Sequence, residues 1–157
     1  SITDAAMRSC VEAVVSRMDW KQAVEHPRRV TLVGHLFDRY EGDHEGDLVQ
    51  LRGMLKGIGL ELGPVLLSGT LYASLREAPK AGIVGLMPYA TPSAKSIARA
   101  TKGRTTVELD LPMGLAGTGR WLRALGERGG ASERAVERFV RGQEAHMRQH
   151  VARWSAR

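Results

Sequence analysis

Short apolar runs alternate with amphipathic stretches along most of the chain. Four runs are almost continuously hydrophobic, as in strands buried on both faces, at residues 30–34, 62–67, 81–87 and 105–109. Apolar residues at helical spacing predict helices at residues 3–18, 48–58, 71–77, 91–102, 119–127 and from 133 to near the C-terminus. Strands that alternate with helices predict a parallel sheet covered by helices on both faces.

The predicted fold class is therefore α/β, a flavodoxin- or Rossmann-like three-layer sandwich. Right-handed crossover connections favour the order 2-1-3-4 for its four parallel strands. Breaks in the pattern divide the chain into an N-terminal helix and linker (1–28), the α/β domain (29–128) and a C-terminal basic amphipathic helix (129–157), which extends the fold.

Helix signals at several positions support these boundaries. Asp47 is placed to cap the helix at 48–58, and Gly59 to end it. Thr91 followed by Pro92 reads as an N-cap with proline in the first helical position, and Ser132 as the cap of the last helix.

Composition narrows the class of protein. Of 157 residues, 43% are hydrophobic and 25% charged, close to globular averages. No apolar run approaches the roughly 18 residues of a membrane span, and the first 30 residues contain no signal-peptide core, so we expect a cytoplasmic protein. Cys10 is the only cysteine, which excludes an internal disulfide and a cluster held by cysteines of this segment alone.

The net charge of +6 is concentrated at the C-terminal end. Residues 120–157 carry nine Arg and four Glu, whereas the preceding residues are close to neutral. A basic helix is compatible with nucleic acid or an acidic partner. No nucleic-acid motif or interleaved aromatic residues accompany it, so we expect a solvated arginine-rich face and no nucleic-acid partner.

Candidate chemistry lies in the loops that follow the predicted strands, because ligands bind beyond the carboxyl ends of parallel strands. The first loop is acidic, and His35, Asp38 and Asp43 are its candidate ligand-cleft residues. The alternative is a solvated loop whose carboxylates repel one another in water. Its spacing matches no calcium-binding loop, and no metal site is assigned to it or to any other segment.

A glycine-bearing turn at residues 112–119 follows the fourth strand. Gly114, Gly117 and Thr118 are candidates there, because glycines before a helix present backbone N–H groups to an anion. The spacing is neither a Walker loop nor the dinucleotide-binding fingerprint. A tight turn with Thr118 as helix cap is the alternative interpretation.

The second and third strands end at Ser68-Gly69 and at Tyr89, which complete the candidate ligand cleft. A hydrolase that uses Ser68 as nucleophile and His35 as base is a further hypothesis. The segment lacks the nucleophile-elbow context, however, and no catalytic residue is assigned.

The last helix carries one apolar stripe, made of Val136, Val140, Met147, Val151 and Trp154. Packing within the chain is one interpretation, and contact with another domain or subunit is the other. If Trp154 anchors an absent partner, we expect its indole to be exposed to water in this chain. His146 and His150 are expected to be ordinary surface residues of the same helix.

Several of these segments, in this order, resemble the middle domain of the nitrogenase component 1 superfamily. The resemblance covers about residues 29–128 and rests on the segments Val30-Thr-Leu-Val-Gly34, Gly46-Asp47-Leu, Leu51-x-x-Met-Leu55-x-x-Ile-Gly59-Leu, Ser68-Gly69-Thr70, the strand ending at Tyr89, and Leu111-Pro-Met-Gly-Leu-x-Gly117-Thr118-x-x-Trp121-Leu122. That superfamily comprises nitrogenase catalytic subunits, cofactor-assembly scaffolds, and the dark-operative protochlorophyllide and chlorophyllide reductases.

The resemblance implies one domain of a larger reductase subunit. The metallocofactor or tetrapyrrole would lie between such domains, with the candidate residues facing that cleft. The implied partners are the other domains of the same subunit, a homologous second subunit and an ATP-dependent iron–sulfur reductase that supplies electrons. This segment alone would bind no cofactor, and an iron–sulfur cluster would be held elsewhere in the subunit.

One position departs from the nitrogenase pattern. The cofactor-bearing nitrogenase subunit has a cysteine ligand beside the tyrosine at the third strand's end, and Pro88 stands there in this chain. The resemblance therefore favours a tetrapyrrole reductase, with chlorophyllide reductase of bacteriochlorophyll biosynthesis slightly preferred. The alternative is a stand-alone small-molecule-binding or cofactor-scaffold domain without catalysis.

Overall fold

The computed structural model describes residues 2–35, 44–68 and 71–155. The strands are β1 (His26–Val33), β2 (Glu61–Val65), β3 (Ala81–Leu86) and β4 (Thr105–Glu108). The α-helices are α1 (Ile2–Arg17), α2 (His44–Gly57), α3 (Tyr72–Leu75), α4 (Ala94–Ala100), α5 (Gly114–Arg128) and α6 (Glu133–Ser155). Two short 3₁₀ turns, η1 (Ala78–Lys80) and η2 (Thr91–Ser93), precede β3 and α4.

The sheet has four parallel strands in the order β2-β1-β3-β4. Both the α/β class and the predicted strand order are therefore confirmed. Val30 of β1 pairs with Leu62 on one side and with Ile83 on the other, which makes β1 and β3 the central strands.

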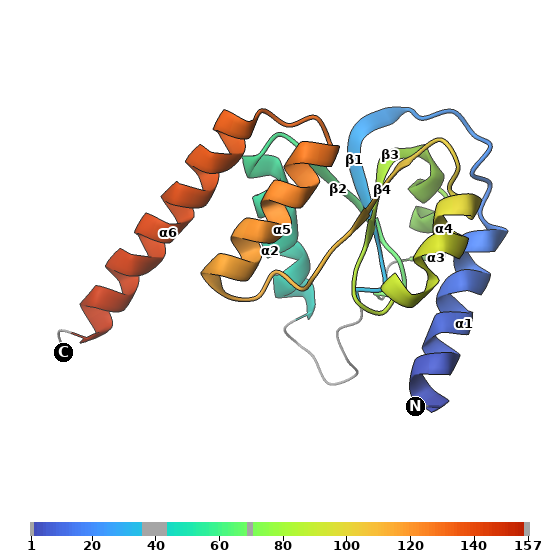
Figure 1. Ribbon diagram of the computed structural model, residues 1–157, viewed down its shortest axis with the longest axis horizontal. Coiled ribbons are helices and arrows are strands. Elements are labelled where there is room, and N and C mark those ends of the chain that lie inside the picture. The colour runs from blue at the N-terminus through green and yellow to red at the C-terminus, as the bar shows by residue number, and fades with distance from the viewer. Residues whose placement is uncertain (1, 36–43, 69–70, 156–157) are drawn as a thin grey trace.

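Helices cover both faces of the sheet, and each face has its own core (Figure 1). The core beneath α2, α5 and α6 contains Leu55, Trp121 and Val140. The core on the other face lies beneath α1 and α4 and contains Val15 and Ile97. The near-continuous apolar strands of the sequence follow from this arrangement, because successive strand side chains enter opposite cores.

Gly59 ends α2 as predicted. Its φ of +80° lies in the left-handed region that glycine adopts without strain. The Leu60 N–H donates to the Leu55 carbonyl at 2.9 Å and the Gly59 N–H to the Lys56 carbonyl at 3.1 Å. This is the Schellman arrangement, which satisfies carbonyls left open at a helix end.

Three predicted helix starts are wrong. Helix α2 begins at His44, so Asp47 lies in its first turn and is not its cap. Thr91 is the first residue of η2, and its hydroxyl donates back to the Met87 carbonyl at 3.4 Å. Helix α5 begins at Gly114, five residues before the predicted start. Glycine has a low helix propensity, so the pattern predicts that α5 starts after the first glycines of this segment. In the structure tertiary packing outweighs that propensity, and the helix includes them.

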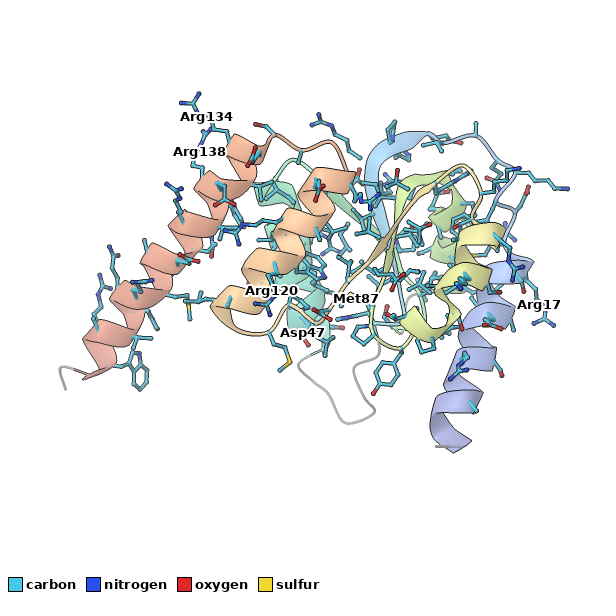
Figure 2. All side chains as sticks on the ribbon, in the orientation of Figure 1. Arg17, Asp47, Met87, Arg120, Arg134 and Arg138 are labelled. Carbon is cyan, nitrogen blue, oxygen red and sulfur yellow. The ribbon has the colours of Figure 1, made fainter. Side chains whose placement is uncertain are left out.

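Helix α6 packs by its first half and projects from the body of the molecule by its second half (Figure 1). Arg134 and Arg138 extend from its outer side, away from the sheet (Figure 2). Trp154, near its end, is 74% exposed, as expected for an indole without a partner in this chain. No helix within the described ranges is long and apolar enough to cross a lipid bilayer.

Candidate functional site

Three backbone hydrogen bonds align the strand ends just beyond the sheet. The Leu66 N–H donates to the Leu32 carbonyl, Met87 to Val33, and Leu109 to Leu86, each at 2.8 Å. All four chain segments therefore leave the sheet in register at one boundary, which we call the carboxyl end of the sheet. This is the position at which open α/β sheets bind ligands.

The ends of β1 and β3 meet most closely. Gly34 has a φ of +77°, and a Cβ at this position would collide with the backbone nitrogen of Ala90. No side chain fits this position, so the two central strands approach each other backbone to backbone. The chain leaves these two adjacent strands in opposite directions across the sheet, so their ends form its topological switch point.

His35 follows Gly34 directly at this point. Its imidazole is only 1% exposed. A histidine side chain is therefore buried at the carboxyl end of the sheet, next to the close approach of β1 and β3. Tyr89, at the end of β3, is by contrast 45% exposed, and so offers a ring and a hydroxyl group to a ligand.

Ser68 lies after β2 in a strained segment. Leu67 is the only described residue other than glycine with a positive φ, at +64°. Ser68 is buried, and its hydroxyl donates to the Val65 carbonyl at 2.6 Å. Positive φ at leucine costs on the order of 1 kcal/mol, and such strain gathers at ligand sites.

The segment that contains Gly114, Gly117 and Thr118 is helical, so the predicted tight turn with Thr118 as helix cap is wrong. Gly114 opens α5 with a φ of +64°, and Met113 holds the N-cap position without a side-chain hydrogen bond. The Thr118 hydroxyl donates to the Pro112 carbonyl at 2.9 Å, so it ties the preceding loop to the helix and does not cap it.

Gly114 and Thr118 also border a cavity of about 370 Å³. It lies between α2, α5 and α6, and Met54 and Met147 contribute to its walls. Two candidate positions therefore face the α2–α5–α6 side of the molecule, whereas His35, Ser68 and Tyr89 follow the other three strands. Asp38, Asp43 and Gly69 lie outside the described residues.

Sequence reasoning missed Leu67 and the cavity methionines. Leucine is not a turn residue, so nothing in the pattern signals a left-handed conformation at the end of an apolar run. Met54 and Met147 lie in predicted helices, and helical periodicity does not show which apolar residues will line a cavity. Among the described residues, no three His, Cys, Asp or Glu side chains lie close enough together to hold a metal ion.

The fold and the arrangement of its strand ends define a parallel α/β domain of the kind that holds ligands beyond its sheet. A family model described as Nitrogenase component 1 type Oxidoreductase matches residues 3–157. The chain therefore belongs to the nitrogenase component 1 type oxidoreductases, and the resemblance seen in the sequence is confirmed. A comparison with curated proteins gave no match.

Proposed function

We propose that this chain is one α/β domain of a nitrogenase-like reductase subunit and that the carboxyl end of its sheet borders the binding site of a tetrapyrrole. Electrons would come from an ATP-dependent iron–sulfur reductase, through a cluster bound by other segments. The observation that carries the proposal is the family match over residues 3–157, joined to the alignment of His35, Ser68 and Tyr89 at three strand ends.

The donor set at this boundary favours a tetrapyrrole over a thiolate-held metallocofactor. Soft metal clusters need cysteine ligands, and the single Cys10 lies on the surface of α1. The end of β3 carries Pro88 and Tyr89 instead. A tetrapyrrole needs an apolar and aromatic surface with a few polar groups, and the exposed Tyr89, with polar side chains after β1 and β2, is of that kind.

In this role the chain's own residues bind and orient the ligand. The half-exposed Tyr89 ring offers a face for stacking, and its hydroxyl a hydrogen bond. His35 and Ser68 are held rigidly by their burial, which favours a fixed ligand orientation over an adaptable one.

The proposal is tested by titrating the reductase subunit that contains this domain with chlorophyllide and recording visible circular dichroism, which a chiral site changes when a pigment binds in one orientation. We expect an altered signal, and about a tenfold weaker affinity for Tyr89→Ala. Trp154→Ala is the matched control, because it removes an exposed aromatic ring from the projecting half of α6.

Three results would contradict the proposal. The first is an unchanged pigment signal, and the second is equal weakening by the Tyr89 and Trp154 variants, as in nonspecific adsorption. The third is pigment binding that disappears in Cys10→Ser, since a cysteine-dependent site would be elsewhere than the carboxyl end of the sheet. A domain that binds pigment but supports no ATP-dependent reduction in its full subunit would instead be a scaffold without catalysis.

A further inference from the structure

The outer edge of the sheet at β4 is open. Within the described part of the chain, β4 pairs only with β3. The Leu109 N–H donates inward to the Leu86 carbonyl, and hydrogen-bonding direction alternates along a parallel strand. The backbone N–H and C=O groups of Thr106 and Glu108 therefore point away from the sheet.

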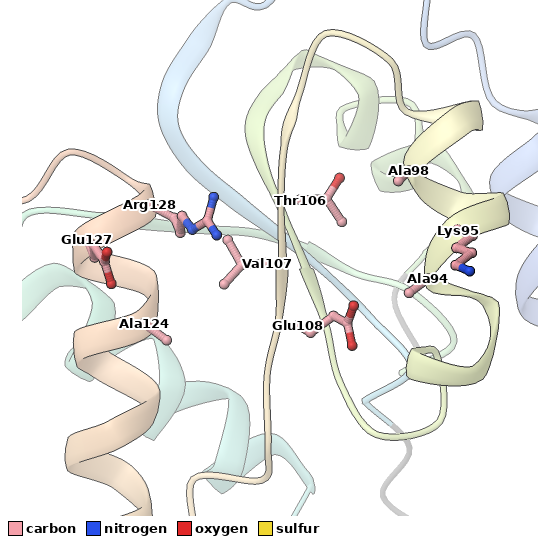
Figure 3. A pocket seen from close by; sticks show the side chains of 9 residues that line it. All are labelled: Ala94, Lys95, Ala98, Thr106, Val107, Glu108, Ala124, Glu127 and Arg128. Carbon is pink, nitrogen blue, oxygen red and sulfur yellow. The ribbon is translucent and has the colours of Figure 1, made fainter.

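A groove of about 530 Å³ runs along this edge, between α4 and α5. Figure 3 shows β4 in its floor, with the Thr106 and Glu108 side chains directed toward α4 and Val107 toward α5. Its helical walls carry the small side chains Ala94, Ala98 and Ala124. Space and open backbone groups together make this edge suitable for one more strand.

The charges of the groove are balanced and unpaired. Lys95 and Arg128 supply two positive charges, and Glu108 and Glu127 two negative ones. The ion pairs among the described residues, namely those of Arg29, Lys80 and Arg123, involve none of these four side chains. A surface that meets its own copy across a two-fold axis must be self-complementary, and equal numbers of acids and bases satisfy that condition.

We propose that β4 is an interface at which two copies of this chain join their sheets. The two β4 strands pair antiparallel about a two-fold axis at Val107, so that Thr106 of each copy exchanges both backbone hydrogen bonds with Glu108 of the partner subunit. Because the two-fold axis is perpendicular to the sheet, side chains on the α4 face of one copy lie on the same face of the joined sheet as those on the α4 face of the other. Lys95 is then within reach of the partner's Glu108, which lies opposite Thr106 on the α4 face.

This surface is the lateral edge of the sheet and contains none of His35, Ser68 and Tyr89. Its test therefore does not depend on the proposed tetrapyrrole site. The measurement is molar mass by light scattering during size-exclusion chromatography, over a series of chain concentrations. We expect a dimer that dissociates on dilution, and slower hydrogen exchange at the Thr106 and Glu108 amides in the dimer than in the monomer.

Charge reversal tests the proposed side-chain contacts. Lys95→Glu places like charges together twice in each dimer, and we expect its dissociation constant to rise at least about tenfold. Arg99→Glu is the matched control, since it makes the same change at an exposed position of α4 outside the groove. The double variant Lys95→Glu/Glu108→Lys should recover dimerisation, because it reverses both members of the pair.

A backbone variant tests the strand pairing directly. Glu108→Pro removes an outward N–H without breaking the ladder to β3, and should weaken the dimer more than Glu108→Gln does. Far-ultraviolet circular dichroism verifies that each variant folds. A chain that stays monomeric at every concentration would overturn the proposal. So would a dimer that survives Lys95→Glu and Glu108→Pro but is lost in Trp154→Ser, since it would form through α6.

Discussion

At the residue scale, Gly34 is the position on which the candidate site depends most. Its backbone is in the left-handed conformation, and it has no space for a side chain. A Cβ at this position would collide with the backbone nitrogen of Ala90. The obstruction is backbone, which cannot rotate away as a flexible side chain does. Gly34 therefore fixes how closely the ends of β1 and β3 approach, and with them the place of His35.

Gly34→Ala is expected to be strongly destabilising, and Gly103→Ala is its matched control. Gly103 has a φ of +91° but open space around its Cβ position, so its variant measures the cost of the left-handed conformation alone. That cost is about 1–2 kcal/mol, and the collision at Gly34 adds roughly 1–3 kcal/mol. Urea unfolding of both variants measures the difference, and equal losses would show that the strand ends can move apart.

The ion pair between Arg123 and Glu137 gives a prediction on pH dependence. Arg123 donates to both carboxylate oxygens, at 2.5 and 3.1 Å. These hydrogen bonds lower the pKa of Glu137 below its ordinary value of 4.5. A carboxylate with a lowered pKa stabilises the fold above the ordinary pKa, and this contribution is lost as the pH falls through the folded-state value.

We therefore expect Glu137→Gln to be less stable than the wild type at neutral pH and to approach it as the pH falls well below the ordinary carboxyl pKa of 4.5. The measurement is the free energy of unfolding across a pH series, in a double-mutant cycle with Arg123→Gln. The coupling energy of the pair should vanish at the acid end. A coupling that stays constant with pH would mean that hydrogen-bond geometry, and not the charge of Glu137, holds α5 to α6.

At the element scale, α6 is divided by burial. Val140 is buried against Gly119 of α5, whereas Val151 is 58% exposed on the projecting half. The apolar stripe identified in the sequence continues through both halves, so periodicity alone gave no sign of where contact with the body ends. The end of this contact is set by how far α5 extends beneath α6. The sequence pattern does not show which residues of α6 lie against α5.

Val140→Ala and Val151→Ala make this division measurable. The first removes two methyl groups from the core and should cost about 1.5–2.5 kcal/mol. The second removes exposed methyl groups and gains helix propensity, so it should be neutral or stabilising by up to roughly 0.5 kcal/mol. Urea midpoints of the two variants suffice. A clear loss for Val151→Ala would show that the projecting half packs on the protein.

At the scale of the whole molecule, the sequence predicts the strand order and layers of the fold well, but it predicts the first and last residues of individual helices poorly. Four apolar runs separated by helical stripes leave few topologies once crossovers are right-handed, and the order β2-β1-β3-β4 follows. The start of α5 was missed because Gly117 and Gly119 are read as turn residues, whereas both are buried in the helix and Gly119 lies against Val140 of α6. The sequence can place candidate residues after particular strands, but which of them share a cavity depends on side-chain packing between elements.

The two cores raise the question of whether the molecule unfolds as one unit. Leu55 and Ile97 are almost fully buried on opposite faces of the sheet. Both cores include side chains of the same central strands, since Leu32 belongs to one and Val33 to the other. Loss of either core leaves these strands with one face in water, so we expect neither half to remain folded alone.

Leu55→Ala and Ile97→Ala test this expectation. Each should lower the free energy of unfolding by about 2–5 kcal/mol, and each should keep a single urea transition with the wild-type m value, because the same total surface is exposed. Fluorescence and circular dichroism should give coincident curves, since Trp121 lies in one core and Trp20 in the other. A variant that unfolds in two steps, with one tryptophan still buried between them, would show that the sheet couples its two faces only weakly and that each core is a separate folding unit.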